Sequence, residues 1–140
     1  MKLHRRSLLL NASRIMATLL AVEAISPALA ASSDSVLFSL PEGAKSNFAT
    51  VNGVKLHYVS MGSGPLVVLL HGWPQTWFSW KEIMQRLSGK FTVVAPDLRG
   101  TGLSGITEDG YDKETIAKDI RDLVLHLGFK AANIVGHDMG

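Results

Sequence analysis

The chain of 140 residues contains no cysteine, so disulfide bonds and a thiol nucleophile are both excluded. Charge of neither sign dominates, because 14 basic residues stand against 12 acidic ones. A membrane-spanning helix needs about 20 predominantly apolar residues, and the one candidate run is interrupted by Arg14 and Glu23. The remaining composition, 46% hydrophobic and 19% charged, is typical of a globular chain with room for one small domain.

Residues 1–30 are predicted to be a secretory signal peptide. A basic start with Arg5 and Arg6 precedes an apolar core at residues 15–22, and residues 26–30 form an A-x-A cleavage site. We therefore expect export to the periplasm or the extracellular space, with no stable membrane insertion after cleavage. The paired arginines also resemble a twin-arginine motif, so both that route and the general secretory route stay open.

The net charge of +2 belongs to this targeting segment. Residues 31–140 hold ten basic and eleven acidic side chains, which leaves a net charge of −1. A positively charged surface is the electrostatic footprint of a nucleic-acid-binding protein. We therefore expect no nucleic-acid partner.

The rest of the chain divides into a serine-rich linker or arm at residues 31–47 and an α/β domain at residues 48–140. Asn52-Gly53 predicts a two-residue turn in a β-hairpin over residues 48–59. Continuous apolar runs predict buried strands, and apolar residues at three- and four-residue spacing predict helices. The expected strands are 66–70, 91–95 and 133–135; the expected helices are 77–87, with the apolar stripe Trp77, Trp80, Ile83, Met84 and Leu87, and 113–127, with Asp112 as N-cap. This order predicts an antiparallel entry hairpin followed by parallel strands with crossover helices.

The final five residues, Gly136-His137-Asp138-Met139-Gly140, follow the last predicted strand. The pattern G-x-D-x-G has the spacing of a strand-to-helix elbow, in which small residues flank a nucleophile held in a strained conformation. A carboxylate is already anionic at neutral pH, so Asp138 needs no base before it attacks an electrophilic carbon. A plain helix N-cap is the alternative interpretation of Asp138 taken alone.

Two further motifs lie in loops that follow strands, where open parallel sheets bind ligands. His71-Gly72-Trp73-Pro74 follows one predicted strand, and residues 97–104 match D-x-R-G-x-G-x-S after the next. Together with the elbow, these motifs resemble the α/β-hydrolase fold family, in particular its aspartate-nucleophile branch of epoxide hydrolases and dehalogenases. The resemblance covers residues 48–140 and implies the N-terminal part of such a domain, truncated at the elbow.

The resemblance implies a two-step hydrolysis. Asp138 forms an ester with the substrate, and water then hydrolyses it while the backbone N–H groups of Trp73 and Met139 form the oxyanion hole. Trp73, Pro74 and His137 are expected to contact the substrate, and Pro74 to shape its loop, if need be through a cis bond. The residues expected to shape the two loops are His71, Gly72, Gly136 and Gly140.

The residue after the nucleophile helps to choose among reactions. Met139 stands where fluoroacetate dehalogenases tend to carry arginine and haloalkane dehalogenases tryptophan, and Trp73 stands where the latter tend to carry Asn or Glu. The pattern favours epoxide hydrolysis to diols. A haloalkane or haloacid dehalogenase is the enzymatic alternative, and a non-catalytic truncated product is the other. In the family, the base, its acid and the cap residues come later in the chain, so we expect residues 1–140 alone to be inactive.

Other polar residues receive simpler interpretations. His57 and His126 are predicted to be surface or packing residues, and no histidine pair has metal-ligand spacing with a nearby acid. Residues 100–105 match G-x-G-x-x-G, but spacers separate the glycines from the preceding strand and from the following helix, which excludes a dinucleotide fingerprint. We expect no metal and no cofactor, and a small epoxide or halogenated molecule as substrate.

Overall fold

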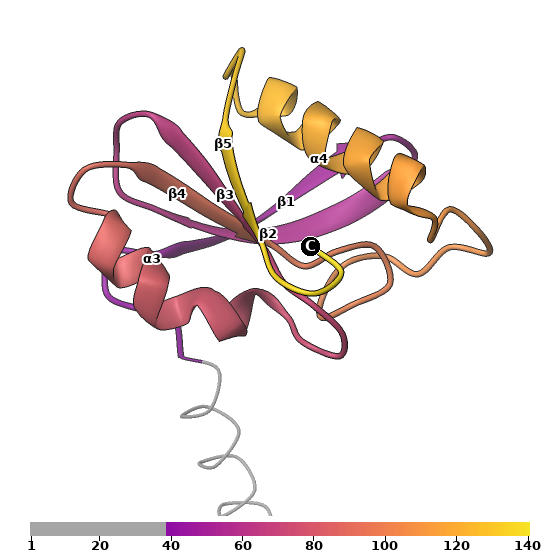
Figure 1. Ribbon diagram of the computed structural model, residues 1–140, viewed down its shortest axis with the longest axis horizontal. Coiled ribbons are helices and arrows are strands. Elements are labelled where there is room, and N and C mark those ends of the chain that lie inside the picture. The colour runs from indigo at the N-terminus through magenta and orange to yellow at the C-terminus, as the bar shows by residue number, and fades with distance from the viewer. Residues whose placement is uncertain (1–38) are drawn as a thin grey trace, which may run out of the picture. The chain divides into compact units, whose positions relative to one another are not determined.

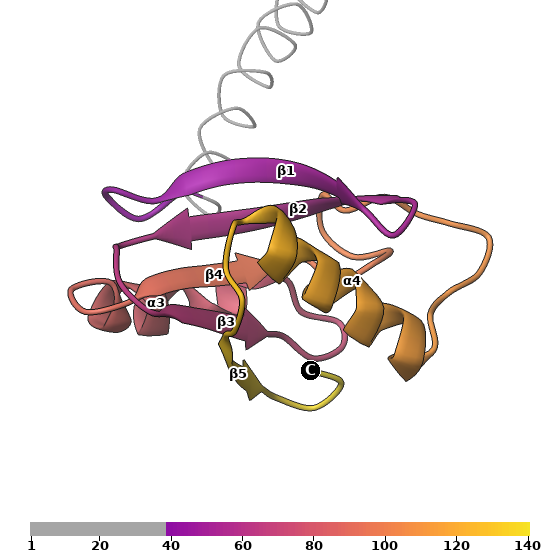
Figure 2. The same cartoon turned by 90° about the horizontal axis from the view of Figure 1, so that it is seen from above.

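The computed structural model describes residues 39–140, so the predicted signal peptide and most of the predicted linker lie outside the described residues. The described part forms a five-stranded sheet in the order β1-β2-β4-β3-β5 (Figures 1 and 2). The elements are β1 (Lys45–Val51), β2 (Val54–Met61), β3 (Leu66–Leu70), the 3₁₀ helix η1 (Trp77–Trp80), α3 (Lys81–Leu87), β4 (Thr92–Pro96), α4 (Lys113–His126) and β5 (Asn133–Gly136).

The predicted entry hairpin is present as β1 and β2. Asn52 and Gly53 have φ of +43° and +76°, the left-handed values that a two-residue hairpin turn requires. β2 then pairs antiparallel with β4, while β3 pairs parallel with both β4 and β5. The hairpin is longer than expected: β1 begins at Lys45, inside the predicted linker, because Lys45 pairs with Ser60 near the end of β2.

Both predicted helices form, with one correction to each. The segment 77–87 begins as η1 and becomes α-helical only at Lys81, and Ile83 of its predicted apolar stripe is 39% exposed. Met84, which the predicted stripe also contains, is the buried residue of α3. α4 ends at His126, one residue early, and its N-cap is Asp112 as predicted, with the carboxylate accepting from the Thr115 N–H at 2.9 Å.

Apolar side chains cover both faces of the sheet, which explains why β3 and β4 are continuously hydrophobic. In Figure 1, α4 lies on one face of the sheet and α3 on the other. Val68 and Val94 pack in the cluster that contains the apolar stripe of α4, whereas Val67, Leu69 and Val93 pack in the cluster that contains Met84 of α3. Successive residues of a strand point to opposite faces, so each strand supplies both cores.

Residues 133–135 form the predicted strand, but the prediction that this strand is buried is wrong. β5 is a strand, but all four of its residues are exposed, with Ile134 at 52% and Val135 at 43%. It is the edge strand, and within residues 39–140 it pairs only with β3. Because β3, β4 and β5 run parallel, their carboxyl ends lie at the same end of the sheet.

Candidate active site

The turn after β5 places Asp138 at the end of the sheet where the carboxyl ends of the parallel strands lie. Asp138 has φ of +58°, a region that side chains other than glycine seldom occupy. A Cβ on Gly136 would overlap the carbonyl of Gly140, and a Cβ on Gly140 would overlap the carbonyl of Leu70. Neither flank has room for a side chain, which is the property that the elbow spacing predicts. Asp138 itself is exposed to solvent.

Two backbone N–H groups converge on the Asp138 carboxylate. The Trp73 N–H donates to Oδ1 at 3.0 Å, and the Met139 N–H, on the next residue, acts on the pKa of the same carboxylate. These hydrogen bonds, first from Trp73 and then from Met139, lower the pKa of Asp138 below its usual value, with smaller contributions from the charges of His137 and Lys113. The two groups predicted to form an oxyanion hole therefore lie at the same carboxylate.

The loop that carries Trp73 is fixed by contacts of its own residues. The Trp73–Pro74 peptide bond is cis. The Gln75 N–H donates to the Gly72 carbonyl at 2.8 Å, and the Gln75 side-chain oxygen accepts from the Gly72 N–H at 3.2 Å. A Cβ on Gly72 would lie 2.5 Å from Cβ of Asp138, so only glycine lets this loop approach the elbow.

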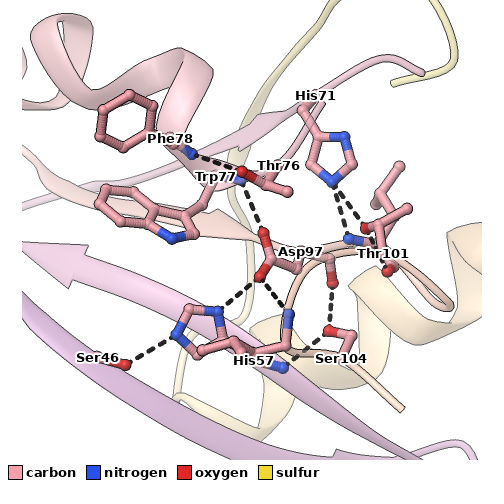
Figure 3. A network of polar contacts seen from close by, with 11 residues as sticks. Ser46, His57, His71, Thr76, Trp77, Phe78, Asp97, Thr101 and Ser104 are labelled. Atoms are coloured by element: carbon pink, nitrogen blue, oxygen red, sulfur yellow. Dashed lines mark hydrogen bonds and ion pairs between the residues drawn. The ribbon is translucent and has the colours of Figure 1, made fainter. Parts of the chain in front are cut away.

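His71 is buried, at 1% exposure, and both of its ring nitrogens are engaged. Nε2 accepts from the Leu98 N–H at 3.0 Å and lies 3.2 Å from Oγ1 of Thr101 (Figure 3). Nδ1 lies 2.9 Å from the Gly72 carbonyl oxygen. A backbone N–H can only donate, so Nε2 carries no proton and the ring is the neutral tautomer with hydrogen on Nδ1.

The loop after β4 is organised around the buried carboxylate of Asp97, the first residue of the D-x-R-G-x-G-x-S motif. Oδ1 accepts from the Trp77 N–H at 2.8 Å; Oδ2 accepts from the Leu103 N–H at 3.0 Å and lies 2.8 Å from Nδ1 of His57 (Figure 3). Burial raises the pKa of Asp97, but the hydrogen bonds from His57, Leu103 and Trp77 outweigh it, so the pKa lies below its usual value. A Cβ on Gly102 would overlap this carboxylate.

The other polar residues of the motif are also buried and paired. Arg99 makes a bidentate contact with Asp119 of α4, with Nε and Nη2 at 2.9 and 2.8 Å from the two carboxylate oxygens. This hydrogen bonding raises the pKa of Arg99. Asn52 of the hairpin turn donates to Asp119 at 2.8 Å, and Ser104 donates to the Asp97 carbonyl. The motif therefore ties the loop to α4 and to the hairpin.

A cavity of about 220 Å³ adjoins Trp73 and Met139. Its lining includes Trp73, Met139, Tyr111 and Ile116. The Trp73 residue is 69% exposed to solvent. Of the residues predicted to contact substrate, the structure places Trp73 on this cavity but not Pro74 or His137. A larger groove of about 640 Å³ along α4 and β5 reaches Met139 but not Trp73, so the smaller cavity is the one that the two donors share.

Sequence reasoning missed the polar pairs beneath the site. His57 was predicted to be a surface or packing residue, but at 1% exposure it pairs with Asp97 and also contacts Oγ of Ser46 at 2.8 Å. No motif marked Asp119, which is the buried partner of Arg99. Asp97 and Arg99 were marked by their motif, but their partners lie on other elements, 40 and 20 residues away.

Two further observations concern residues 39–140 only: potential metal ligands and membrane-spanning helices. Within this range, no group of three or more His, Asp or Glu side chains is arranged to hold a metal ion. No helix in the same range has the length and apolar character needed to cross a membrane.

The chain belongs to the α/β hydrolase fold family, whose model matches residues 65–140. It is 51% identical over 92 residues to a soluble epoxide hydrolase from Corynebacterium sp. (strain C12), which covers 66% of this chain and 32% of that protein. It is 41% identical over 93 residues to epoxide hydrolase 3 of Mus musculus, covering 64% of this chain and 25% of the relative.

Solved structures of epoxide hydrolases also match this chain. The fold matches the epoxide hydrolase CorEH with a TM-score of 0.68 and 48% identity, covering 69% of this chain and 34% of the other. An epoxide hydrolase from Vigna radiata matches with a TM-score of 0.68 and 37% identity, covering 71% and 32%. The chain thus spans a quarter to a third of the length of these relatives. The predicted fold class, the N-terminal part of an α/β-hydrolase sheet, is confirmed.

Proposed function

We propose that this chain supplies the nucleophile and the oxyanion hole of an epoxide hydrolase. The observation that carries the proposal is the convergence of the Trp73 and Met139 N–H groups on the exposed carboxylate of Asp138. The names of the similar proteins, which include epoxide hydrolases from bacteria, animals and plants, support the same reaction. The substrate would be a small epoxide, and the product a diol.

In the first step, a carboxylate oxygen of Asp138 attacks a ring carbon of the epoxide. A carbon–oxygen bond forms to Asp138, the ring carbon–oxygen bond breaks, and a general acid protonates the released oxygen. The low pKa of Asp138 keeps the carboxylate anionic and ready to attack at neutral pH. The oxygen held by Trp73 becomes the carbonyl oxygen of the ester, so the donors are in place before the second step.

In the second step, water adds to the ester carbonyl carbon of Asp138. Negative charge develops on the carbonyl oxygen, and pre-aimed N–H donors stabilise that charge most strongly in the transition state. The bond between Cγ of Asp138 and the alkoxy oxygen then breaks, and that oxygen takes up the proton that the water gave to the base. The diol leaves and the carboxylate is regenerated. Loss of one such donor typically slows a reaction by about 10²–10³-fold.

Mass spectrometry of the protein after incubation with an epoxide tests the proposal directly. We expect an adduct of the substrate mass on Asp138 in the parent and none in the Asp138→Asn variant. Parallel incubations with an epoxide and a haloalkane distinguish the two reactions by diol or by released halide. Halide release without diol formation would replace the proposed reaction by dehalogenation, and an adduct elsewhere would remove Asp138 as nucleophile.

We also propose that residues 1–140 alone do not complete the cycle. Hydrolysis of the ester needs a histidine base with access to the water molecule. His57 and His71 are each 1% exposed and engaged elsewhere, and His126 lies in the last turn of α4. His137 is exposed beside Asp138 but does not line the cavity that the two donors share. We expect the purified 140-residue chain to show no turnover, and multiple turnovers by it would contradict the proposal.

Export remains part of the proposal for residues 1–30, a segment outside the described residues. Cell fractionation should find the protein outside the cytoplasm with the first 30 residues removed. Replacing Arg5 and Arg6 by lysine distinguishes the routes, because the twin-arginine route requires the pair and the general route needs only positive charge. A processed cytoplasmic protein, or an unprocessed one, would contradict export.

A further inference from the structure

The oxyanion donor and the buried His71 are linked through a single peptide unit. The Trp73 N–H belongs to the same planar group as the Gly72 carbonyl, and in a trans peptide these two bonds point in opposite directions. His71 donates from Nδ1 to that carbonyl at 2.9 Å. Whatever holds the Gly72 carbonyl in place therefore also aims the Trp73 N–H, which lies 3.0 Å from Oδ1 of Asp138.

The His71 ring is itself held from the loop after β4. The Leu98 N–H donates to Nε2 at 3.0 Å, which forces the proton onto Nδ1, the nitrogen that faces the Gly72 carbonyl. Oγ1 of Thr101 adds a second contact to Nε2 at 3.2 Å. The loop after β4 also holds the C-terminal end of the segment 71–77, because Asp97 accepts from the Trp77 N–H at 2.8 Å (Figure 3).

We propose that His71 is a positioning residue that orients the Gly72–Trp73 peptide and thereby controls the second step of the proposed reaction, ester hydrolysis. The inference rests on the proposed function of Asp138. His71 is buried and engaged at both nitrogens, so it does not act as the base. Its contribution falls on the oxyanion, which forms when water attacks the ester and not when the carboxylate attacks the substrate.

Two substitutions separate the nitrogens of His71. In His71→Asn, the amide nitrogen takes the place of Nδ1 and can still donate to the Gly72 carbonyl. In His71→Gln, the longer side chain reaches the place of Nε2, so the Gly72 carbonyl loses the imidazole donor and keeps only the Gln75 N–H. We expect His71→Gln to slow ester hydrolysis by about 10²-fold or more, ester formation to change less than about tenfold, and His71→Asn to hydrolyse the ester closer to the parent rate.

The measurement is a single-turnover experiment on the intact protein that carries this chain, with styrene oxide as the probe. Quenched samples analysed by mass spectrometry give the rates of formation and decay of the Asp138 ester separately. Selective slowing of decay in His71→Gln supports the proposal. Equal slowing of both steps, or a decay rate equal to that of the parent, overturns it. If the parent forms no ester at Asp138, the proposed function fails as well, which is a distinguishable result.

Thr101→Val serves if the His71 variants do not fold. This change removes the hydroxyl that donates to the Leu98 carbonyl at 2.7 Å and lies 3.2 Å from Nε2. It loosens the segment that holds the ring, so we expect a several-fold slower decay of the ester and unchanged formation. Thr107→Val is the matched control, because its hydroxyl contacts Arg99 and the Asp109 carbonyl instead of His71. Equal decay rates in the two threonine variants would overturn the proposal.

Discussion

Asp97 follows β4 and Asp138 follows β5, the two parallel strands that flank β3, and the two carboxylates are held in similar ways. Each accepts a backbone N–H from residues 73–77, and backbone hydrogen bonds hold the pKa of each below its usual value. Their surroundings differ: Asp97 is 1% exposed and paired with His57, whereas Asp138 is exposed. A lowered pKa alone therefore does not mark a nucleophile, because a structural carboxylate shows it too; access to a reactant makes the difference.

The largest expected effect comes from Asp138→Asn. The amide is nearly isosteric with the carboxylate but is not a nucleophile, so we expect activity to fall by at least about 10⁴-fold while the fold stays unchanged. Initial rates of diol formation and circular dichroism of the intact protein check both parts. A variant with substantial remaining activity would show that the exposed aspartate is not the reactive one.

The second prediction concerns the buried member of the pair. Asp97→Ala leaves the N–H groups of Trp77, Leu103 and His57 without their acceptor, and each unsatisfied buried group costs about 1–3 kcal/mol. We expect the free energy of unfolding to fall by at least about 3 kcal/mol, as measured by urea titration. If stability were unchanged, Asp97 would not be the structural hub that its contacts indicate.

Two glycines allow a matched test, because each touches one of the two aspartates. Gly72→Ala would push on Asp138, and we expect activity to fall by about 10²-fold, the cost of a displacement near 1 Å. Gly102→Ala would push on Asp97 at a φ of +52°, and we expect mainly a loss of stability of about 1–2 kcal/mol or more. Rates and unfolding curves of both variants should show this crossed pattern, and equal effects would remove the contrast.

The smallest expected effect is in the pH dependence of stability. The folded pKa of Asp97 is lowered, so its contribution is fully present above the unfolded value of about 3.9 and is lost as pH falls through the folded pKa. The stability difference between the parent and Asp97→Asn should therefore shrink as pH falls below about 4. Asp138→Asn is the control, with a smaller change because solvent screens its interactions. Urea titrations from pH 7 to pH 3 would show a difference that grows on acidification if the sign were wrong.

Local signals predicted the parts of the fold that depend on neighbours in sequence. Asn52-Gly53 predicted the hairpin because its positive φ values are a property of those two residues, and Asp112 predicted the start of α4 because a cap acts within one turn. The glycine spacing likewise predicted the conformation of Asp138. Each of these features requires only a few consecutive residues.

Features that depend on distant partners were not predictable in this way. His57 is buried because it pairs with Asp97, 40 residues later in the chain. The residues of β2 around His57 form no pattern that predicts this pairing. Ile134 and Val135 are exposed because no described element covers them. An apolar run predicts that a strand can be buried, but not whether another element packs on it. The elbow pattern placed the nucleophile candidate, whereas the support of its donor through His71 required the three-dimensional structure.

The pairing of β5 with β3 bears on the order in which the molecule assembles. The hairpin turn joins Val51 to Val54 across two residues, but the contact between Leu66 and Asn133 spans 67 positions and that between Trp73 and Asp138 spans 65. Closing a longer loop costs more entropy, so the carboxylate and its donor should meet late in folding and separate early when the protein opens. Amide hydrogen exchange at Trp73 would then register loss of the catalytic arrangement before the hairpin has begun to open.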